Sequence, residues 1–272
     1  TKGRGLVRSI EACFNRFFID PADMSSNMED HDRVVDRVPW DLEAVVVSRP
    51  NRFLLIADVI KDGGGVISNE RIHVHDPGRL KEIIFPGNRI RIKSATKPGR
   101  TTAWDLVFGM VGGDWVLVNS SNHRKISESI LTDPDLTPIG NISEIQPEFR
   151  IGKSRLDFRL ILEDGDYCFV EVKGCTLTKN GKALFPDAPT TRGTRHLREL
   201  VSLKKNGHRS AVIFLVLGPS PQCFSPNSET DPEFTKAFDD ATKAGVEIYP
   251  LRLHAEDDGI ILDGLVPLCG RS

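Results

Sequence analysis

Two carboxylates and one lysine stand at a spacing that suits phosphodiester hydrolysis. Asp157 comes early in the apolar run Leu156–Leu162, while Glu171 and Lys173 belong to the later run Phe169–Lys173. Side chains alternate along a strand, so Glu171 and Lys173 face the same side of it. A short turn sequence joins the two runs, which therefore predict a hairpin. In that hairpin the two acids and the lysine converge.

Two acids placed together inside a sheet repel each other and lose hydration, and a bound divalent cation relieves both costs. Oxygen ligands favour Mg²⁺ or Mn²⁺, which we predict to be held by Asp157 and Glu171. The cation would polarise a phosphodiester and lower the pKa of a bound water, with Lys173 orienting that water or stabilising developing charge. The pattern resembles the D…ExK signature of restriction-endonuclease-like nucleases. An ordinary exposed strand face with a Glu–Lys pair is the alternative.

Two further acids are possible additions to this cluster. Glu148 lies nine residues before Asp157, in or before the preceding strand. It is predicted either as a third carboxylate of the site or as a surface strand residue. Asp187 is predicted either as a fourth acid or as the partner of Arg192.

A loop between Gly181 and Leu200 combines small residues, hydroxyls and basic side chains, and it leads into a predicted helix. Backbone N–H groups at a helix N-terminus, with Arg and Thr side chains, hold phosphate well. A structural loop with Arg–Asp pairs is the alternative. The predicted nucleic-acid contacts of this half of the chain are Arg155, Lys182, Thr190, Arg192 and His196.

The N-terminal half carries polar groups beside short strands. Between residues 44 and 120 about five β-rich runs alternate with turns, which suits a small barrel such as an OB fold. On such a barrel we expect Asn51, Arg52 and Arg79 to contact nucleic acid. Phe53 is predicted to lie in the core rather than to stack on bases.

From about residue 124 the pattern changes to alternating helices and strands. Helices are expected over 124–131, over 194–206 and from Asp231-Pro232-Glu233 to Gly245, with strands over 148–151, 155–162, 167–173, 211–217 and 246–253. Strand–helix–strand repeats place parallel strands beside the antiparallel hairpin. The sequence therefore predicts a mixed sheet flanked by helices.

Charge and composition narrow the function classes. Residues 49–100 hold 11 Lys/Arg against 5 Asp/Glu, residues 150–209 hold 13 against 7, and residues 229–263 hold 3 against 10. Two basic segments in a chain of net charge −2 suggest a positive groove for a polyanion, or else ordinary solvated faces. A content of 39% hydrophobic and 27% charged residues excludes collagen-like, coiled-coil and mostly disordered chains.

The cellular compartment is predicted from three sequence features that are missing: a membrane span, a secretory signal and a CxxC pair. No apolar run approaches the roughly 20 residues of a membrane span, and no secretory signal is expected. The five cysteines, Cys13, Cys168, Cys175, Cys223 and Cys269, include no CxxC pair. We therefore predict reduced thiols in a cytoplasmic protein.

Several longer segments resemble the sugar fermentation stimulation protein A family. They are RPNRF at 49–53, HDPGR at 75–79, SRLDF at 154–158, VEVK at 170–173 and FPDAPTTRGTRHLREL at 185–200. The resemblance covers roughly residues 44–267 and implies an OB-like barrel followed by a restriction-endonuclease-like domain. It also implies DNA binding and a regulatory link to sugar use, and it puts Asp157, Glu171 and Lys173 on nuclease-type positions. Gly174-Cys175 departs from the usual Ser-Val.

The combined fold prediction is an α+β or α/β chain in three parts. Residues 1–41 form an N-terminal extension, either a poorly ordered appendage or a locally ordered arm, residues 42–122 form the barrel, and residues 123–272 form the nuclease-like domain. The functional hypotheses are a metal-dependent nuclease acting on DNA or RNA, a non-catalytic nucleic-acid-binding regulator, and a structural or small-ligand module. DNA is the expected partner, and a homodimer is possible because many restriction-type nucleases work as pairs.

Overall fold

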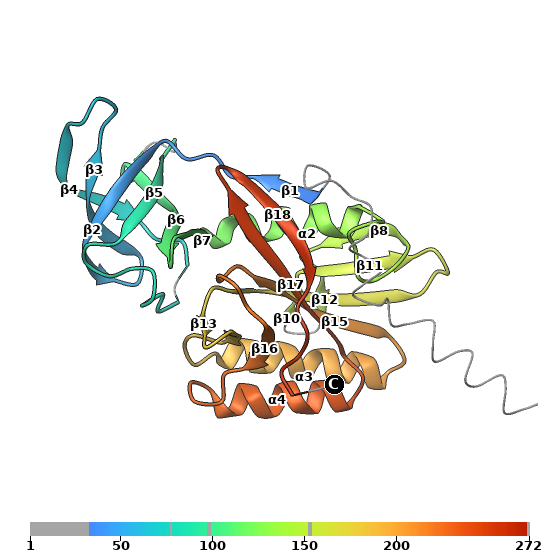
Figure 1. Cartoon of the computed structure of the whole chain (residues 1–272). Coiled ribbons are helices and arrows are strands. Elements are labelled where there is room, and N and C mark those ends of the chain that lie inside the picture. The colour runs from blue at the N-terminus through green and yellow to red at the C-terminus, as the bar shows by residue number, and fades with distance from the viewer. Residues whose placement is uncertain (1–32, 77, 97–98, 152–153, 271–272) are drawn as a thin grey trace, which may run out of the picture.

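The computed structural model describes residues 33–76, 78–96, 99–151 and 154–270, and it forms two bodies (Figure 1). The N-terminal body is a β-barrel, and the C-terminal body is a sheet with helices on both faces. The chain crosses between them more than once. Residues 34–37 belong to the C-terminal sheet, and the barrel follows them in sequence.

Five strands close the barrel, and a sixth extends it. They are β2 (Leu42–Asn51), β3 (Leu54–Ile60), β4 (Val66–His73), β5 (Arg89–Ser94), β6 (Trp104–Val111) and β7 (Asp114–Leu117). The order is β4-β3-β2-β5-β6-β7, and a parallel pairing of β4 with β6 closes the ring. Alternate residues such as Leu55, Ala57 and Val59 point inward and are fully buried. The predicted OB-like barrel is confirmed.

Seven strands form the C-terminal sheet. They are β1 (Val34–Arg37), β18 (Gly259–Leu265), β17 (Glu247–Glu256), β15 (Arg209–Val216), β12 (Tyr167–Cys175), β11 (Phe158–Leu162) and β8 (Ile142–Pro147), in that spatial order. Strands β12, β15 and β17 run parallel, and β11 pairs antiparallel with β12. The predicted mixed sheet with its antiparallel hairpin is confirmed.

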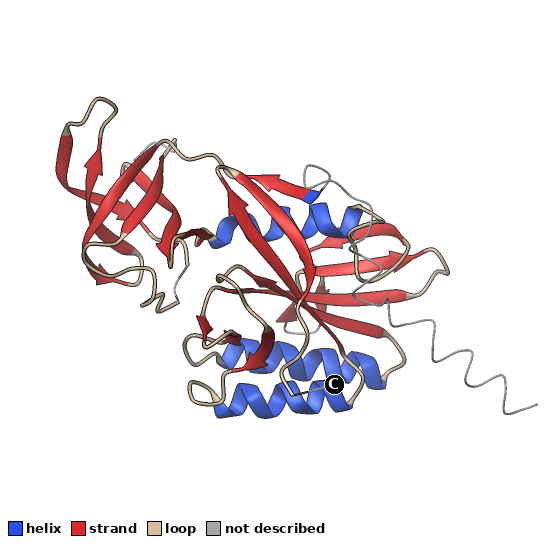
Figure 2. Ribbon diagram, viewed as in Figure 1, coloured by secondary structure: helices blue, strands red, loops and turns tan. Residues whose placement is uncertain are grey.

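In the described part of the chain, three helices cover the sheet, α2 (His123–Thr132) on one face and α3 (Thr191–Lys205) with α4 (Pro232–Lys243) on the other (Figure 2). Helix α4 begins as predicted, because Asp231 accepts a hydrogen bond from the Phe234 N–H at 2.9 Å. A short 3₁₀ turn, η2 (Ser120–Asn122), precedes α2. No helix in the described part of the chain is long and apolar enough to cross a membrane.

Two small sheets complete the domain. One pairs β9 (Arg150–Ile151) with β10 (Ser154–Arg155), and the other joins β13 (Thr178–Lys179), β14 (Lys182–Phe185) and β16 (Cys223–Pro226). The predicted strand over 148–151 is realised only as the short β9, and the strand beside β11 is β8. The backbone leaves the main sheet at Glu148, whose φ is 54°.

Within the predicted N-terminal extension, residues 33–41 are ordered and include strand β1. Strand β1 covers the edge of the sheet by pairing antiparallel with β18, and Val35 is 6% exposed there. An open edge strand carries unpaired backbone groups, and β1 satisfies them. Residues 1–32 lie outside the described residues.

The prediction of reduced thiols is wrong for Cys223 and Cys269, which form a disulfide. Sequence spacing could not reveal it, because the two residues are 46 apart. The isolated bridge between Phe224 and Leu268 brings the C-terminal tail beside β16. The thiols of Cys168 and Cys175 are free and buried, and Cys13 lies outside the described residues.

Candidate functional site

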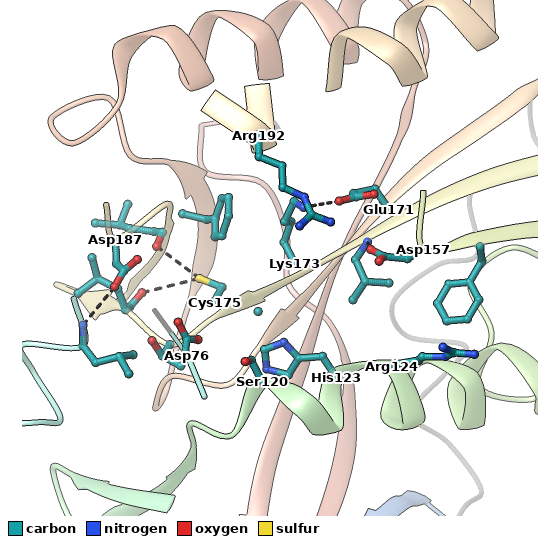
Figure 3. A pocket seen from close by; sticks show the side chains of 18 of the residues that line it. Asp76, Ser120, His123, Arg124, Asp157, Glu171, Lys173, Cys175, Asp187 and Arg192 are labelled. Atoms are coloured by element: carbon teal, nitrogen blue, oxygen red, sulfur yellow. Dashed lines mark hydrogen bonds and ion pairs between the residues drawn. The ribbon is translucent and has the colours of Figure 1, made fainter. Parts of the chain in front are cut away.

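A pocket of about 460 Å³ opens where the barrel meets the C-terminal domain (Figure 3). Its floor is the second half of β12 together with the bend before β11. Its sides are the start of α2, Arg192 at the start of α3, and Asp76 and Leu80 from the barrel. Asp157, Glu171 and Lys173 all line this pocket, at the end away from the barrel loop.

Glu171 is the most enclosed charged group of the pocket. Its residue is 1% exposed, and its Oε1 contacts both Lys173 Nζ and His196 Nδ1. Its Oε2 is buried and has no hydrogen-bond partner among the described residues. Burial acts to raise the pKa of Glu171, but the His196 hydrogen bond and the Lys173 charge outweigh it and hold the pKa below its ordinary value. Glu171 is therefore a carboxylate at neutral pH.

Asp157 lies immediately before β11 and beside Glu171. Its Oδ2 accepts a hydrogen bond from the Val172 N–H at 2.7 Å, which fixes the carboxylate against β12. Burial raises the pKa of Asp157, and the neighbouring charge of Glu171 raises it further. The strand pairing of Phe158 with Val170 brings these two acids together. The convergence of Asp157, Glu171 and Lys173 follows directly from that hairpin.

The donor set at this end of the pocket fits a hard cation held by few protein ligands. Within the described residues no group of three His, Cys, Asp or Glu side chains is arranged to hold a metal. However, the unpartnered Oε2 of Glu171 and the raised pKa of Asp157 are both costs that a cation would remove. Mg²⁺ is usually bound through one or two carboxylates with water completing its shell. The two acids fit that pattern.

His196 occupies a different place from the one predicted. It was expected to contact phosphate, but it is 2% exposed and lies under Glu171 on the buried face of α3. A residue so enclosed cannot reach a polyanion on the surface. Its Nδ1 contact with Glu171 Oε1 instead holds the carboxylate in position.

The start of α3 supplies one basic residue to the pocket. Arg192 is exposed, lines the pocket and makes no ion pair within the part of the chain that the structure describes. Thr190 is the N-cap, because its Oγ1 accepts a hydrogen bond from the Gly193 N–H at 3.0 Å. Lys182 is exposed on β14 and does not line the pocket.

Glu148 stands between two arginines at the pocket mouth. Its carboxylate lies 3.2 Å from Arg124 and 3.4 Å from Arg155, and its side chain is 51% exposed. The Glu148 N–H also donates to the Asp157 carbonyl at 2.7 Å. The structure therefore gives Glu148 an ion-pairing role beside Asp157. Arg124 was missed by sequence reasoning, which treated it only as the start of a helix.

Asp187 lies at the opposite end of the pocket from Glu171 (Figure 3). Its Oδ2 accepts from the Leu80 N–H at 3.2 Å, and it approaches Gly78 closely. Neither predicted role for Asp187 is realised, because its contact is with the barrel backbone rather than with Arg192. It joins the two bodies of the molecule instead.

The barrel residues predicted to contact nucleic acid lie outside the pocket. Asn51 and Arg52 are exposed in the β2–β3 turn, and Arg79 is exposed in the loop after β4. Phe53 was predicted to be core, but it is 50% exposed. The cause is local, because Asn51 Oδ1 accepts from the Phe53 N–H at 2.9 Å in a tight turn that directs the ring outward.

His123 is a pocket residue that sequence reasoning missed. Its ring packs against Gly174, so closely that a Cβ on Gly174 would lie 2.2 Å from His123 Cε1. Burial lowers its pKa to about 4, so the ring is neutral at physiological pH. The available signal was Gly174 itself, since a glycine inside a strand often marks a close approach of another group.

Comparisons with known proteins agree with both bodies. Residues 47–118 match the model of the SfsA N-terminal OB domain, and residues 121–259 match that of the sugar fermentation stimulation protein RE domain. A sugar fermentation stimulation protein homolog of Methanococcoides burtonii is 41% identical over 87% of this chain and 95% of its own length. One from Sulfolobus acidocaldarius is 42% identical over 84% and 89%.

A solved structure is also similar over nearly its whole length. It is described as the structure of Pyrococcus furiosus SfsA in complex with Ca²⁺. It is 28% identical to this chain, covers 86% of it and 99% of its own chain, and superposes with a TM-score of 0.75. The arrangement of a barrel beside a mixed sheet with helices is therefore shared with that protein.

Proposed function

Because the chain belongs to the sugar fermentation stimulation protein family, we propose that it is a DNA-binding protein with a divalent-metal-dependent phosphodiesterase site of the D…ExK type. The observation that carries this proposal is the state of Glu171. The Glu171 carboxylate is buried next to Asp157, with one oxygen bound to Lys173 and the other unpartnered. This arrangement costs folding free energy, so a role in stability alone does not account for it. Such costs concentrate at functional sites.

Asp157 and Glu171 would hold the cation, Mg²⁺ or Mn²⁺. When bound, the metal would polarise a phosphodiester and lower the pKa of a coordinated water. The Pyrococcus furiosus relative was solved with Ca²⁺, another cation that prefers oxygen ligands, and this supports the proposal. The mouth of the pocket admits the substrate between the two bodies.

Lys173 and His196 have separate tasks in this proposal. Lys173 keeps its ammonium group at the pocket by its contact with Glu171 Oε1, where it would orient the attacking water and offset charge developing on the phosphate. His196 is a positioning residue, because it holds the same oxygen from the buried side and touches no solvent-facing group.

Basic side chains around the pocket would hold the DNA backbone. Arg124, Arg155 and Arg192 stand nearest to the acids, and Glu148 partly neutralises the first two. A phosphate would replace Glu148 between those arginines. Lys182, Arg79, Asn51 and Arg52 lie farther out and would extend the contact along the backbone.

One observation favours the alternative of a non-catalytic, DNA-binding regulator linked to sugar metabolism. Lys173 and His196 already compensate one oxygen of Glu171, and only two acids converge in the described structure. A site of that kind can persist without a metal. The same basic surface would then bind DNA without cutting it.

The deciding experiment is cleavage of end-labelled single- and double-stranded DNA, with Mg²⁺ or Mn²⁺ against EDTA. Wild-type protein is expected to cut only with metal. Glu171→Gln and Lys173→Ala are each expected to lose at least about a hundredfold in rate, the usual scale for removing a preorganised charged group. Binding of Mn²⁺, measured by calorimetry without DNA, should weaken in Glu171→Gln and persist in Lys173→Ala.

Glu229→Gln is the matched control, because Glu229 is exposed and does not line the pocket. It should cut as the wild type does. If wild type and Glu171→Gln show the same metal-independent background while both bind DNA, the nuclease assignment fails and the regulator stands.

A further inference from the structure

A second groove lies on the barrel at the β2–β3 turn, with a volume of about 680 Å³. Its walls come from that turn, from the end of β4 and from the loop before β6. We call it the barrel groove and define it by Phe53, Arg71, His73, His75, Arg100 and Thr101. The phosphodiesterase proposal uses none of these six residues.

Phe53 presents its ring to this groove on a fixed backbone. The Phe53 N–H donates to Asn51 Oδ1 at 2.9 Å, and the Phe53 carbonyl accepts from the Val74 N–H at 3.0 Å. The side chain is nevertheless half exposed. The Arg52 guanidinium lies 5.8 Å from the ring centroid, so a cation already sits by the aromatic face. The backbone that carries the ring is therefore fixed before any ligand arrives.

Two histidine rings add further flat surface. His73 and His75 meet edge to face, with their centroids 4.5 Å apart. His75 is anchored by Asp105 at 3.2 Å, and Arg100 holds the same carboxylate. Burial lowers the pKa of His73, and the neighbouring His75 and Arg100 lower it further, so its ring is neutral at physiological pH. A neutral imidazole stacks on a nucleobase as other aromatic rings do.

The charge of the groove complements a polyanion. Asp105 neutralises Arg100. Arg71 and Arg52 are exposed and form no ion pair within the described residues. Aromatic faces flanked by uncompensated arginines are the combination that binds single strands, because every base has a π-face and every link carries a phosphate. A paired, stacked duplex offers no free base faces to such a platform.

The barrel groove and the pocket are lined by neighbouring residues of the sequence. His75 lines the groove and the next residue, Asp76, lines the pocket. Arg49 fixes the two together, since its guanidinium donates to the Arg52 carbonyl at 3.0 Å and to the Gly78 carbonyl at 2.9 Å. One backbone segment therefore carries residues of both the groove and the pocket.

We propose that the barrel groove binds an unpaired stretch of nucleic acid, with bases stacked on Phe53 and His73 and phosphates held by Arg71 and Arg52. This inference rests on the proposed function. It names the substrate class of the pocket, which is nucleic acid with a single-stranded segment beside the bond that is cut. The groove itself can be tested without any cleavage.

The test is fluorescence anisotropy in EDTA with a labelled oligothymidylate of 15 nucleotides and with a flush-ended duplex of the same length. Phe53→Ala should weaken binding of the single strand about tenfold, within the range expected for one stacked base. Phe53→Trp should retain binding. Arg71→Gln should reduce the slope of log Kobs against log salt by about 0.7. Duplex binding should not change with Phe53→Ala.

Matched controls come from the β3–β4 turn, at the other end of this hairpin. Val66→Ala removes an exposed apolar side chain, and Lys61→Gln removes an exposed charge. Both should bind the single strand as the wild type does. An oligouridylate of equal length distinguishes RNA from DNA, and a groove-dependent affinity for either supports the site.

Unchanged single-strand affinity in Phe53→Ala, or an equal loss for strand and duplex, would overturn the groove. That failure is separable from failure of the nuclease. If Phe53→Ala still cuts all substrates in the presence of metal, the groove proposal fails and the proposed role of the pocket stands. If the protein binds single strands through Phe53 but never cuts them, the catalytic proposal fails and the groove proposal stands.

Discussion

Asp157 and Glu171 are neighbours whose environments push their pKa values in opposite directions. For Asp157, burial and the nearby Glu171 charge disfavour the ionised form, and the Val172 N–H only partly offsets them. For Glu171, His196 and Lys173 outweigh burial. Glu171 is therefore held as a carboxylate, whereas ionising Asp157 costs free energy. A divalent cation would remove that cost, which is the physical reason to regard the pair as a site.

The cost at Asp157 predicts a stabilising substitution. A carboxyl whose pKa is raised on folding contributes stability that is present below its unfolded pKa and lost as the pH rises through the folded value. At pH 7, the free energy of unfolding of Asp157→Asn should therefore exceed that of wild type by about 1 kcal/mol, and the variant should unfold at a higher temperature. This gain comes at the expense of activity. The difference should shrink as the pH falls toward 4.

Thermal unfolding in EDTA between pH 4 and pH 8 measures this. Asparagine keeps an oxygen for the Val172 N–H, so the variant loses little else. The exposed Asp114→Asn serves as control and should show no such trend. A less stable Asp157→Asn at pH 7 would contradict the assigned cost.

At the scale of elements, β12 does most to organise the site. One face of it enters the core with α2 and the barrel, through residues such as Val170, and the other face enters the core with α3 and α4. Glu171 and Lys173 lie on the second face, at the edge where the pocket opens. Directly after them, Gly174 lets the start of α2 approach until the His123 ring touches the strand. The pocket depends on that close contact.

Gly174→Ala tests this contact between β12 and α2. The added methyl group would lie 2.2 Å from His123 Cε1, so the ring must move, and overpacking of this kind costs about 1–3 kcal/mol of unfolding free energy. Combining it with His123→Ala should recover part of the loss, which a double-mutant cycle by urea denaturation would measure.

Gly65→Ala is the control, because its Cβ would meet Lys61 only at ordinary contact distances. It should leave the free energy of unfolding nearly unchanged. Additive losses in Gly174→Ala with His123→Ala would show that the two positions are not in contact.

At the scale of the whole molecule, Arg91 is a link between the two bodies. It belongs to β5, its guanidinium lies 4.0 Å from the Trp40 ring centroid and 4.3 Å from that of Trp115, and it donates to the Asp257 carbonyl at 3.0 Å. Its side chain is only 11% exposed. With the contact of Asp187 and Leu80, it sets where the barrel loop lies over the pocket.

Arg91→Ala should loosen this link, by removing a stacked and largely desolvated guanidinium together with its hydrogen bond. The expected loss is about 1–3 kcal/mol in urea denaturation followed by tryptophan fluorescence. Arg89→Ala on the same strand is the control, since its side chain is 56% exposed and its ion pair with Glu43 should contribute about 1 kcal/mol or less. Equal losses in the two variants would argue against Arg91 as the link.

Several features of this protein were determined by local sequence alone. Alternation along 167–173 put Glu171 and Lys173 on one face, the turn before it made the hairpin with Asp157, and Asp231-Pro232 set the start of α4. These depend on backbone periodicity and on hydrogen bonds between near neighbours. Such interactions act in the same way in any tertiary context.

Other features were decided only by tertiary structure. His196 was turned inward to Glu171, Asp187 was drawn to Leu80, β1 was paired with β18, and Cys223 met Cys269. In most of these cases the partner is far away in the chain. Its position follows from packing the barrel, the sheet and the helices together, which no local pattern encodes.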